Sequence, residues 1–268
     1  MNIVTWNAER MFSHGGGNTR ATPEDAIKTL QTLNADVVAI PEFASKSSLK
    51  QATLDAIALL GYQVVTVEYA DERASGLLFA MLSRVDIKDS IIHQFENSER
   101  FAVELRVRYH EDVLSIIGTH LDDRSEVQRR HEAACAINII ANIKHQVVFL
   151  GDMNALHGEA WQARLLRLWP VRLLAKLSPS RDGYSIGERL VEMASGGTIA
   201  AIQAQTSLVN ATSLRPTISA KQIGLEWAPS SALVKIDWIF VSKTVQVIDD
   251  NVFPDVGSDH RPLLVIIK

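Results

Sequence analysis

Polar residues that can do chemistry follow apolar runs at several points of this chain. The clearest run is VVFLGDMNAL, 147–156, in which four apolar residues lead directly into Gly151, Asp152, Met153 and Asn154. A buried carboxylate is energetically costly unless a partner group compensates its charge. Asp152 is therefore either a turn residue in solvent or a buried acid that faces something positive.

The same pattern recurs at five further places in the chain. In each, an apolar run ends in or contains a carboxylate, an amide or an imidazole: VTWN at Asn7, VVAIPE at Glu42, IIGTH at His120, KIDWIF at Asp237, and GSDH at Asp259 and His260. Ligand sites gather at strand ends in open α/β sheets, so these side chains are expected to meet at one edge. The site would then hold four carboxylates, two amides and two histidines.

The donor types in this set indicate a metal ion. Four neighbouring carboxylates repel one another and cannot all stay ionised without a cation. Carboxylate and amide oxygens suit a hard divalent ion, Mg²⁺ or Mn²⁺, better than Zn²⁺. The single cysteine, Cys135, leaves neither an intrachain disulfide nor a thiolate cluster. The pattern therefore predicts a Mg²⁺ or Mn²⁺ site in which Asp152 faces the metal or its water.

The overall composition limits the partners of the protein. The 268 residues are 47% hydrophobic and 22% charged, which is ordinary for a globular protein. A net charge of −4 and an isoelectric point of about 6.1 argue against a broad basic surface for non-specific DNA binding, although a local phosphate site remains compatible. The N-terminal MNIVTWNAER carries no signal-peptide pattern, and no apolar stretch has the length of a membrane span. We therefore expect a cytoplasmic protein, and nothing in the sequence indicates an oligomer.

The elements that would position the polar residues alternate between strands and helices. Strands are expected at 2–7, 35–40, 62–69, 76–83, 101–109, 113–119, 147–150, 233–241 and 262–267, and helices at 22–33, 48–60, 124–142, 159–168 and 188–194. The first helix has a clear start, with Thr22 as N-cap and Pro23 at the first helical position. No repeat or linker interrupts the pattern, which favours one α/β domain over residues 1–268 with a mixed sheet system.

Taken in order, these motifs resemble the endonuclease/exonuclease/phosphatase superfamily. That superfamily includes deoxyribonuclease I, apurinic endonucleases, neutral sphingomyelinases, inositol polyphosphate 5-phosphatases and tyrosyl-DNA phosphodiesterase 2. The matching segments are WN (6–7), PE (41–42), SR (83–84), THLD (119–122), GDMN (151–154), IDWIF (236–240) and SDHRP (258–262). The likeness includes the tyrosyl-DNA phosphodiesterase 2 branch and small bacterial relatives. It implies a four-layer α-β-β-α sandwich with two packed mixed sheets.

The resemblance also implies which residues hold the metal and the attacking water. Glu42 would be the main metal ligand, with Asn7 and Asp259 close to the metal. Asp152 would position or deprotonate the attacking water. Asn154 would hold a phosphate oxygen. These roles match the needs of in-line displacement at phosphorus, which requires a positioned water and neutralised charge.

The resemblance assigns the remaining polar residues to the phosphate and the leaving group. Asp237 would pair with His260 and fix its tautomer, so that His260 stabilises the transition state. His120 would contact the phosphate or protonate the leaving oxygen, and a histidine at this position argues against an abasic-site enzyme. Arg100, just before a strand, would face the phosphate or lie at the surface. Glu72 would orient His120.

The segment 156–231 is the variable part of the chain and is expected to determine the substrate. Basic residues cluster there among large apolar ones: Arg164, Arg167, Arg172, Lys176 and Arg181 lie among Trp161, Leu165, Leu168 and Trp169. Arginine with aromatic residues suits a phosphate-backbone or lipid-headgroup face. The alternative is the solvated face of a helix that packs on the core.

These observations lead to a functional expectation with two alternatives. The first expectation is a divalent-metal-dependent phosphoesterase that hydrolyses phosphodiester bonds, of nuclease type on DNA or RNA and without sequence specificity. The alternative enzyme is a phosphatase or phospholipase-C-type diesterase acting on an inositol phosphate or a phospholipid. The alternative from another class is a non-catalytic binding module, which would typically have lost one of the acidic or histidine positions.

Overall fold

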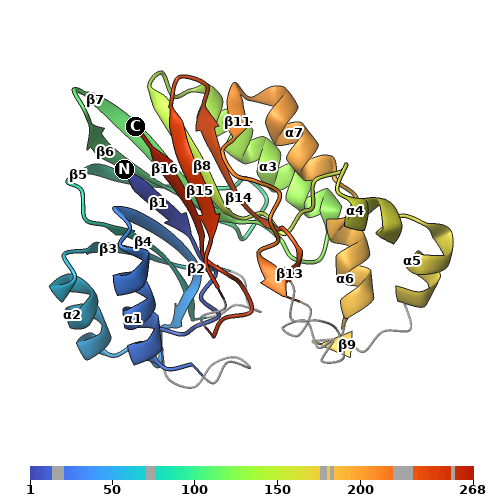
Figure 1. Cartoon of the computed structure of the whole chain (residues 1–268), viewed down its shortest axis with the longest axis horizontal. Coiled ribbons are helices and arrows are strands. Elements are labelled where there is room, and N and C mark those ends of the chain that lie inside the picture. Colours follow the sequence, from blue (N-terminus) through green and yellow to red (C-terminus); the bar gives the residue numbers. More distant parts are fainter. Residues whose placement is uncertain (14–20, 71–75, 176–179, 182–183, 220–231, 255–256) are drawn as a thin grey trace.

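The computed structural model describes residues 1–13, 21–70, 76–175, 180–181, 184–219, 232–254 and 257–268. Within this part of the chain, two six-stranded sheets form the centre of the molecule (Figure 1). The first sheet has the order β15 (Val247–Val252), β16 (Leu263–Ile267), β1 (Asn2–Thr5), β2 (Val37–Ser45), β4 (Leu77–Ser83), β3 (Gln63–Glu68). The second has the order β11 (Leu208–Asn210), β14 (Asp237–Ser242), β8 (Gln146–Asp152), β7 (Asp112–His120), β6 (Phe101–Tyr109), β5 (Ile87–Gln94).

Both sheets are mixed, because each contains one parallel pair among antiparallel neighbours. β1 pairs with β2 in parallel, and β7 pairs with β8 in parallel. Two short ribbons are separate from these sheets, one of β9 (Ser180–Arg181) with β10 (Tyr184–Ser185) and one of β12 (Ile218–Ser219) with β13 (Ala232–Val234).

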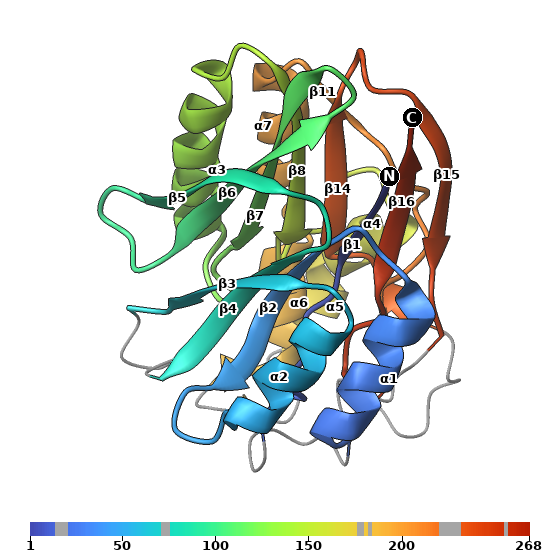
Figure 2. The ribbon, with the colours of Figure 1, turned by 90° about the vertical axis from the view of Figure 1, so that its left-hand side faces the viewer.

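Helices cover the outer face of each sheet (Figures 1 and 2). The first sheet carries α1 (Pro23–Leu33) and α2 (Gln51–Leu59), and the second carries α3 (Glu126–Ala141) and α7 (Gly197–Gln205). The α1 side chains Ala26, Leu30 and Leu33 are buried in one cluster with β1 and β2 residues. The α3 side chains Ala133 and Ile137 are buried in another cluster with β7 and β8 residues. The fold is thus the four-layer α-β-β-α sandwich that the resemblance implied.

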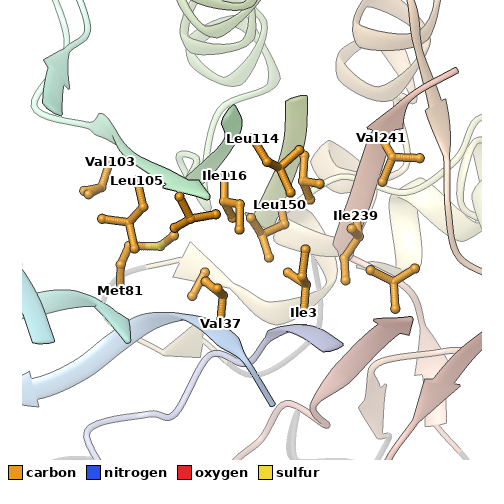
Figure 3. Close-up of a cluster of buried hydrophobic side chains, with 14 of the residues drawn as sticks. Ile3, Val37, Met81, Val103, Leu105, Leu114, Ile116, Leu150, Ile239 and Val241 are labelled. Atoms are coloured by element: carbon orange, nitrogen blue, oxygen red, sulfur yellow. The ribbon is translucent and has the colours of Figure 1, made fainter. Parts of the chain in front are cut away.

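The main core lies between the two sheets (Figure 3). Ile3 and Met81 from the first sheet face Ile116, Leu150 and other side chains of the second, and all four are fully buried. Burial of each such side chain contributes roughly 1.5–3 kcal/mol relative to exposure. This apolar contact holds in place the two sheets whose ends carry the polar residues.

The first helix begins with the N-cap that the sequence predicts. Thr22 and Asp25 form a capping box, in which the Thr22 side chain accepts from the Asp25 backbone N–H and the Asp25 carboxylate accepts from the Thr22 N–H at 3.0 Å. Ser125 caps α3 through the Gln128 N–H. Within the described residues, no helix is both long enough and apolar enough to cross a membrane.

Several expected element boundaries are wrong. The strand expected at 233–241 is divided, because β13 ends at Val234 and pairs outside the main sheets, so Asp237 is the first residue of β14 rather than an interior one. The helix expected at 159–168 is replaced by α4 (Trp161–Leu166) and α5 (Trp169–Ala175). Pro170 lacks the backbone N–H that would continue α4, and its ring would clash with the preceding turn. The chain therefore begins a new helix, α5, next to this proline.

Other elements extend beyond the expectation or escape it. β2 continues through Glu42 to Ser45, and α6 spans Ile186–Met193 where 188–194 was expected. β5, β15 and α7 are elements that the hydrophobic pattern did not predict. The exposure of β5 and β15 explains why they were not predicted. Most of their side chains are partly or fully exposed, and both strands lie at sheet edges.

Candidate active site

The polar residues at the strand ends meet where the two sheets pack together. Asn7 follows β1, and Glu42 lies in the neighbouring β2. In the second sheet His120 ends β7 directly opposite Asp152, which ends β8. Asp237, the first residue of β14, lies opposite Asp152 on the other side. Both strand neighbours of Asp152 therefore present a polar side chain at the same level.

The backbone at the site adopts conformations that few residues accept. Gly151 has a φ of +147°, and a Cβ there would lie 1.9 Å from the Thr119 carbonyl oxygen, so only glycine permits this approach of β8 to β7. Glu42 has a φ of +48° at an irregularity of β2, and Asn154 has a φ of +47°. A left-handed non-glycine residue costs about 1–3 kcal/mol, and bulges often re-aim a side chain beside a functional site.

Asp152 lies at the centre of the site. Its Oδ2 accepts a hydrogen bond from Asn7 Nδ2 at 3.1 Å, and its Oδ1 accepts one from the Asn154 backbone N–H at 3.0 Å. Nε2 of His120 and Nε2 of His260 each lie 3.6 Å from Oδ2. Burial and the neighbouring Asp237 carboxylate raise the pKa of Asp152 to about 7, although His260 and the two hydrogen bonds act in the opposite direction.

His260 is held as a cation by the surrounding acids. Its Nδ1–H donates to Asp237 Oδ2 at 2.8 Å, and Asp237 is fully buried. Burial alone would lower the pKa of His260, but Asp237, Asp152 and Asp259 outweigh it and raise the pKa well above its ordinary value. Ser258 fixes the loop, since its Oγ accepts from the His260 N–H at 3.1 Å and donates to the Asn7 carbonyl at 2.6 Å.

His120 has the opposite protonation state. Burial, and then the positive charges of Arg100 and His260, lower the pKa of His120 well below its ordinary value. Burial also raises the pKa of Tyr69, so the phenol stays protonated. Its O–H donates a hydrogen bond to His120 Nδ1, 3.0 Å away. The remaining proton of the neutral imidazole is then on Nε2, which faces Asp152.

Arg100 is buried rather than at the surface, so that alternative is wrong. Its guanidinium carbon lies 5.3 Å from the Tyr69 ring centroid, and a terminal nitrogen lies 3.8 Å from Asp123 Oδ1. Glu72, expected to orient His120, lies outside the described residues. Tyr69 was not predicted from the sequence, although it directly follows β3, much as His120 and Asp152 end their strands.

The donor set fits a divalent cation. Asn7 Nδ2 lies 3.5 Å from Glu42 Oε1, so the amide touches both the Glu42 and the Asp152 carboxylates. Burial and the nearby Asp259 raise the pKa of Glu42, which indicates surplus negative charge at this point. Among the described residues, Asp237 Oδ1 is buried without a hydrogen-bond partner. Excess buried carboxylate oxygen of this kind is what a hard cation neutralises.

Two groups of ligands overlap at the site, and protonation favours one of them. Potential ligand atoms of Asp152, Asp237 and His260 lie within 4.8 Å of one another. However, the raised pKa of His260 keeps both ring nitrogens protonated, so the imidazolium has no lone pair for a metal, and its Nδ1–H donates to Asp237. The set of Glu42, Asn7 and Asp259 offers oxygen donors only, with Oδ1 as the Asn7 donor atom.

Sequence comparison places the chain in a family. The family model of the endonuclease/exonuclease/phosphatase family matches residues 4–260, and the chain belongs to this family. The members are hydrolases that act on phosphoester bonds, and the site described above has the composition of a phosphoesterase centre. No curated protein matches the chain in sequence.

Solved structures share the fold over the full length. A mannosyl-6-phosphatase from Bacteroides thetaiotaomicron has 14% identity and a TM-score of 0.66, covering 100% of this chain and 99% of that one. An AP endonuclease from Archaeoglobus fulgidus has 14% identity and a TM-score of 0.64, with 100% and 99% covered. TDP2 from D. rerio, complexed with a single-strand DNA product, has 16% identity and a TM-score of 0.64, with 100% and 98% covered.

Proposed function

We propose that the chain is a divalent-metal-dependent phosphodiesterase whose substrate is a nucleic acid, DNA or RNA. The observation that carries the proposal is the position of Asp152 Oδ2, 3.1 Å from Asn7 Nδ2 and 3.6 Å from Nε2 of both His120 and His260. A water beside this oxygen would meet a base and two donors at once. The AP endonuclease and the DNA-bound TDP2 among the similar structures support nucleic acid as the substrate class.

In this proposal Asp152 is the general base. Burial raises its pKa above the ordinary value of an aspartate, which brings its proton affinity closer to that of a base working near neutral pH. The water oxygen forms a bond to phosphorus while its proton passes to Asp152, and the bond from phosphorus to the leaving oxygen breaks. Asn7 and the Asn154 N–H hold the carboxylate in place through their hydrogen bonds.

The two histidines act as donors to the phosphate. The His260 imidazolium carries a positive charge that opposes the charge developing on the phosphate oxygens. The neutral His120 offers its Nε2–H, which favours hydrogen bonding over full proton donation to the leaving oxygen. Asn154 donates its side-chain N–H to the Leu121 carbonyl at 2.9 Å, which fixes the amide for contact with a phosphate oxygen.

Glu42, Asn7 and Asp259 would hold the Mg²⁺ or Mn²⁺. When bound, the cation would neutralise charge on the phosphate oxygens. Arg100 contributes positive charge behind Tyr69, which orients His120. Substitution of each of these residues tests the role assigned to it.

The test is a hydrolysis panel with purified protein in Mg²⁺, Mn²⁺ or EDTA. The substrates are single-stranded DNA, duplex DNA, RNA, a 5′-tyrosyl-DNA mimic, sphingomyelin and bis-p-nitrophenyl phosphate. Asp152→Asn and His260→Ala are expected to lose metal-dependent hydrolysis, whereas the exposed-site controls Asp86→Asn and His110→Ala keep it. Hydrolysis that survives in Asp152→Asn, or absence of hydrolysis on the whole panel, would contradict the proposal.

A second candidate is a phosphodiesterase that acts on a phospholipid or an inositol phosphate. The specific observation in its favour is the exposed apolar and basic surface of α4 and α5, which follows Asn154 after the segment 155–160. In the panel, this candidate predicts cleavage of sphingomyelin or a related lipid with little cleavage of DNA and RNA.

A further inference from the structure

Five large apolar side chains are exposed together on α4 and α5. The exposed fractions are 65% for Trp161, 44% for Leu165, 53% for Leu168, 75% for Trp169 and 52% for Leu173. Trp161 and Leu165 have the spacing i, i+4 that aligns residues on one face of α4, and Leu168 lies between α4 and α5. We call these five side chains, with Arg164 and Arg172, the α4–α5 face.

The charge of this stretch differs from that of the whole chain. Residues 160–181 contain Arg164, Arg167, Arg172, Lys176 and Arg181 and no Asp or Glu, although the chain as a whole carries a net charge of −4. Arg164 and Arg172 are exposed, and neither has an ion-pair partner in the described residues. Arg167 has a different role, because it donates to the Ala194 and Ser195 carbonyls at 2.8 and 2.7 Å and ties α4 to the end of α6.

The packing of α4 leaves its tryptophan outside the core. The fully buried α4 residue is the small Ala163, in a cluster with Leu156, Met193 and Ile236, and Leu166 is partly buried against the same cluster. Trp161 and Leu165 are exposed instead. Figure 1 shows α5 at the outer edge of the molecule, beyond α6 and away from both sheets. The apolar side of this unit is therefore left without a partner in the described structure.

We infer that the α4–α5 face binds the surface of an anionic lipid bilayer. Interfacial helices combine tryptophan and leucine, which enter the headgroup boundary, with arginine and lysine, which attract acidic lipids. Tryptophan is enriched at that boundary because its ring is amphipathic. Each basic residue near an anionic surface contributes about fivefold in binding. The α4–α5 face supplies both the apolar side chains and the basic side chains that such binding requires.

Other occupants fit less well. Single-stranded nucleic acid would use the basic residues and the two tryptophans, but Leu165, Leu168 and Leu173 offer no ring on which a base can stack. A second copy of the chain would bring two basic stretches without acids together, and like charges would repel. A bilayer accommodates the leucines, the tryptophans and the positive charge together.

This inference rests on the α4–α5 face and does not depend on the proposed phosphoesterase activity, although it bears on the choice between the two substrate candidates. The segment between Asn154 and Trp161 joins the site to the face in the chain. A confirmed bilayer contact would favour the lipid or inositol phosphate candidate over nucleic acid.

The test is binding of the full chain to large unilamellar vesicles in EDTA, where no metal-dependent turnover occurs. Vesicles of phosphatidylcholine alone are compared with vesicles that also contain phosphatidylglycerol, by sedimentation and by tryptophan emission with brominated-lipid quenching. The expected result is binding to the anionic vesicles with a blue shift and quenching of emission. Trp6 and Trp238 are fully buried and do not contribute to the shift.

Paired variants separate the apolar and the electrostatic contributions. Trp161→Ala/Trp169→Ala is expected to weaken binding to both vesicle types by about tenfold or more. Arg164→Gln/Arg172→Gln is expected to weaken binding to the anionic vesicles alone, by about 25-fold at about fivefold for each charge.

The controls carry equally exposed residues elsewhere on the surface. Leu59→Ala/Val127→Ala, at sites that are 87% and 81% exposed, and Lys50→Gln/Lys243→Gln are expected to bind as the unsubstituted chain does. Equal losses in test and control pairs would overturn the inference. Absence of vesicle binding would also overturn it. The same holds if the tryptophans bind a single-stranded oligonucleotide instead of vesicles, or if the chain dimerises through this face.

Hydrolysis of soluble bis-p-nitrophenyl phosphate keeps the two proposals apart. The α4–α5 variants are expected to hydrolyse it at the rate of the unsubstituted chain. If the chain binds vesicles but hydrolyses no substrate, the proposed function is refuted and the inference of bilayer binding stands.

Discussion

At the scale of single residues, the site depends on opposite protonation of two histidines around one carboxylate. His260 is charged because three acids surround it, and His120 is neutral because it is buried beside positive groups. Asp152 lies between them at the same 3.6 Å distance from each. Pairs of titratable groups whose environments separate their pKa values are typical of acid–base sites. The difference between the histidines comes from their partners, Asp237 for His260 and Tyr69 for His120.

Substitution of Tyr69 tests the role of this partner. Tyr69→Phe removes the O–H that donates to His120 Nδ1, so the imidazole loses the hydrogen bond that fixes its tautomer. We expect kcat on bis-p-nitrophenyl phosphate to fall roughly ten- to hundredfold with KM nearly unchanged. Nitrogen NMR of His120 should show a mixture of tautomers in the variant.

Tyr109→Phe provides the matched control. The Tyr109 hydroxyl is buried without a hydrogen-bond partner in the described residues, and it lies on β6 outside the site. Its removal is expected to leave kcat unchanged. If both variants lost the same activity, the effect of Tyr69→Phe would be structural and not a result of the contact with His120.

At the scale of elements, the parallel contact of β7 and β8 aligns His120 with Asp152. This contact needs Gly151, where an added Cβ would lie 1.9 Å from the Thr119 carbonyl oxygen. Gly151→Ala is therefore expected to lower the free energy of unfolding by about 2 kcal/mol or more, as measured with denaturant. Gly61→Ala is the control, because its φ of +86° is also left-handed but no atom lies within 4 Å of the added Cβ. It should cost only about 1 kcal/mol, and an equal cost for both would refute the argument from close approach.

A second prediction at this scale concerns Glu104 on β6. Burial opposes its ionisation, but hydrogen bonds from His93, Ser115 and Arg106 outweigh burial and lower its pKa to about 2. A lowered carboxyl pKa contributes stability above the unfolded value of about 4.5, and this stability is lost as pH falls through 4.5 toward 2. The contribution is at most about 3 kcal/mol.

Glu104→Gln should remove that pH dependence. The variant is expected to unfold more easily at pH 7, and its free energy of unfolding should change less between pH 4.5 and 2 than that of the unsubstituted chain. Glu111→Gln, at an exposed position after the same strand, is the control and should leave the pH profile unchanged. Parallel pH profiles for all three proteins would contradict the prediction.

The elements also explain what could be predicted from the sequence. Asn7, His120 and Asp152 were found because an apolar strand stops at a polar residue, which is a local signal. β5 and β15 escaped because edge strands with exposed side chains carry no apolar run. Each pairs with the next strand in the chain, β6 or β16, so its formation depends on that pairing and not on an apolar pattern of its own.

Tyr69 escaped for a related reason, and for the α4–α5 face the sequence left two alternatives open. A tyrosine at a strand end has no special spacing, and its role depends on the distant His120. The large apolar residues of α4 and α5 have the period of a buried helix face, and only the packing against α6 and Leu156 shows that they point outward. Periodicity identifies a face but does not say what covers it.

At the scale of the whole molecule, the site is shared between the two sheets. Asn7 and Glu42 belong to the first sheet side, and His120, Asp152 and Asp237 to the second. The sheets meet closely beneath it, since a Cβ at Gly118 would lie 2.5 Å from the Met81 sulfur across the interface. A ligand that contacts both sets of residues is therefore expected to stabilise the packing of the two sheets.

This arrangement makes metal binding visible in global stability. Without a cation, Glu42 and Asp259 repel each other, and the raised pKa of Glu42 reflects that repulsion together with burial. Mg²⁺ or Mn²⁺ at 100 times its Kd should raise the free energy of unfolding by about 2.7 kcal/mol, since only the folded chain brings the ligands together. The increase is measured by thermal unfolding with and without the ion. Glu42→Gln should abolish most of it, whereas Glu68→Gln, on the exposed end of β3, should keep it. An equal increase in both variants would mean that the ion binds elsewhere, and that Glu42, Asn7 and Asp259 do not form the metal site.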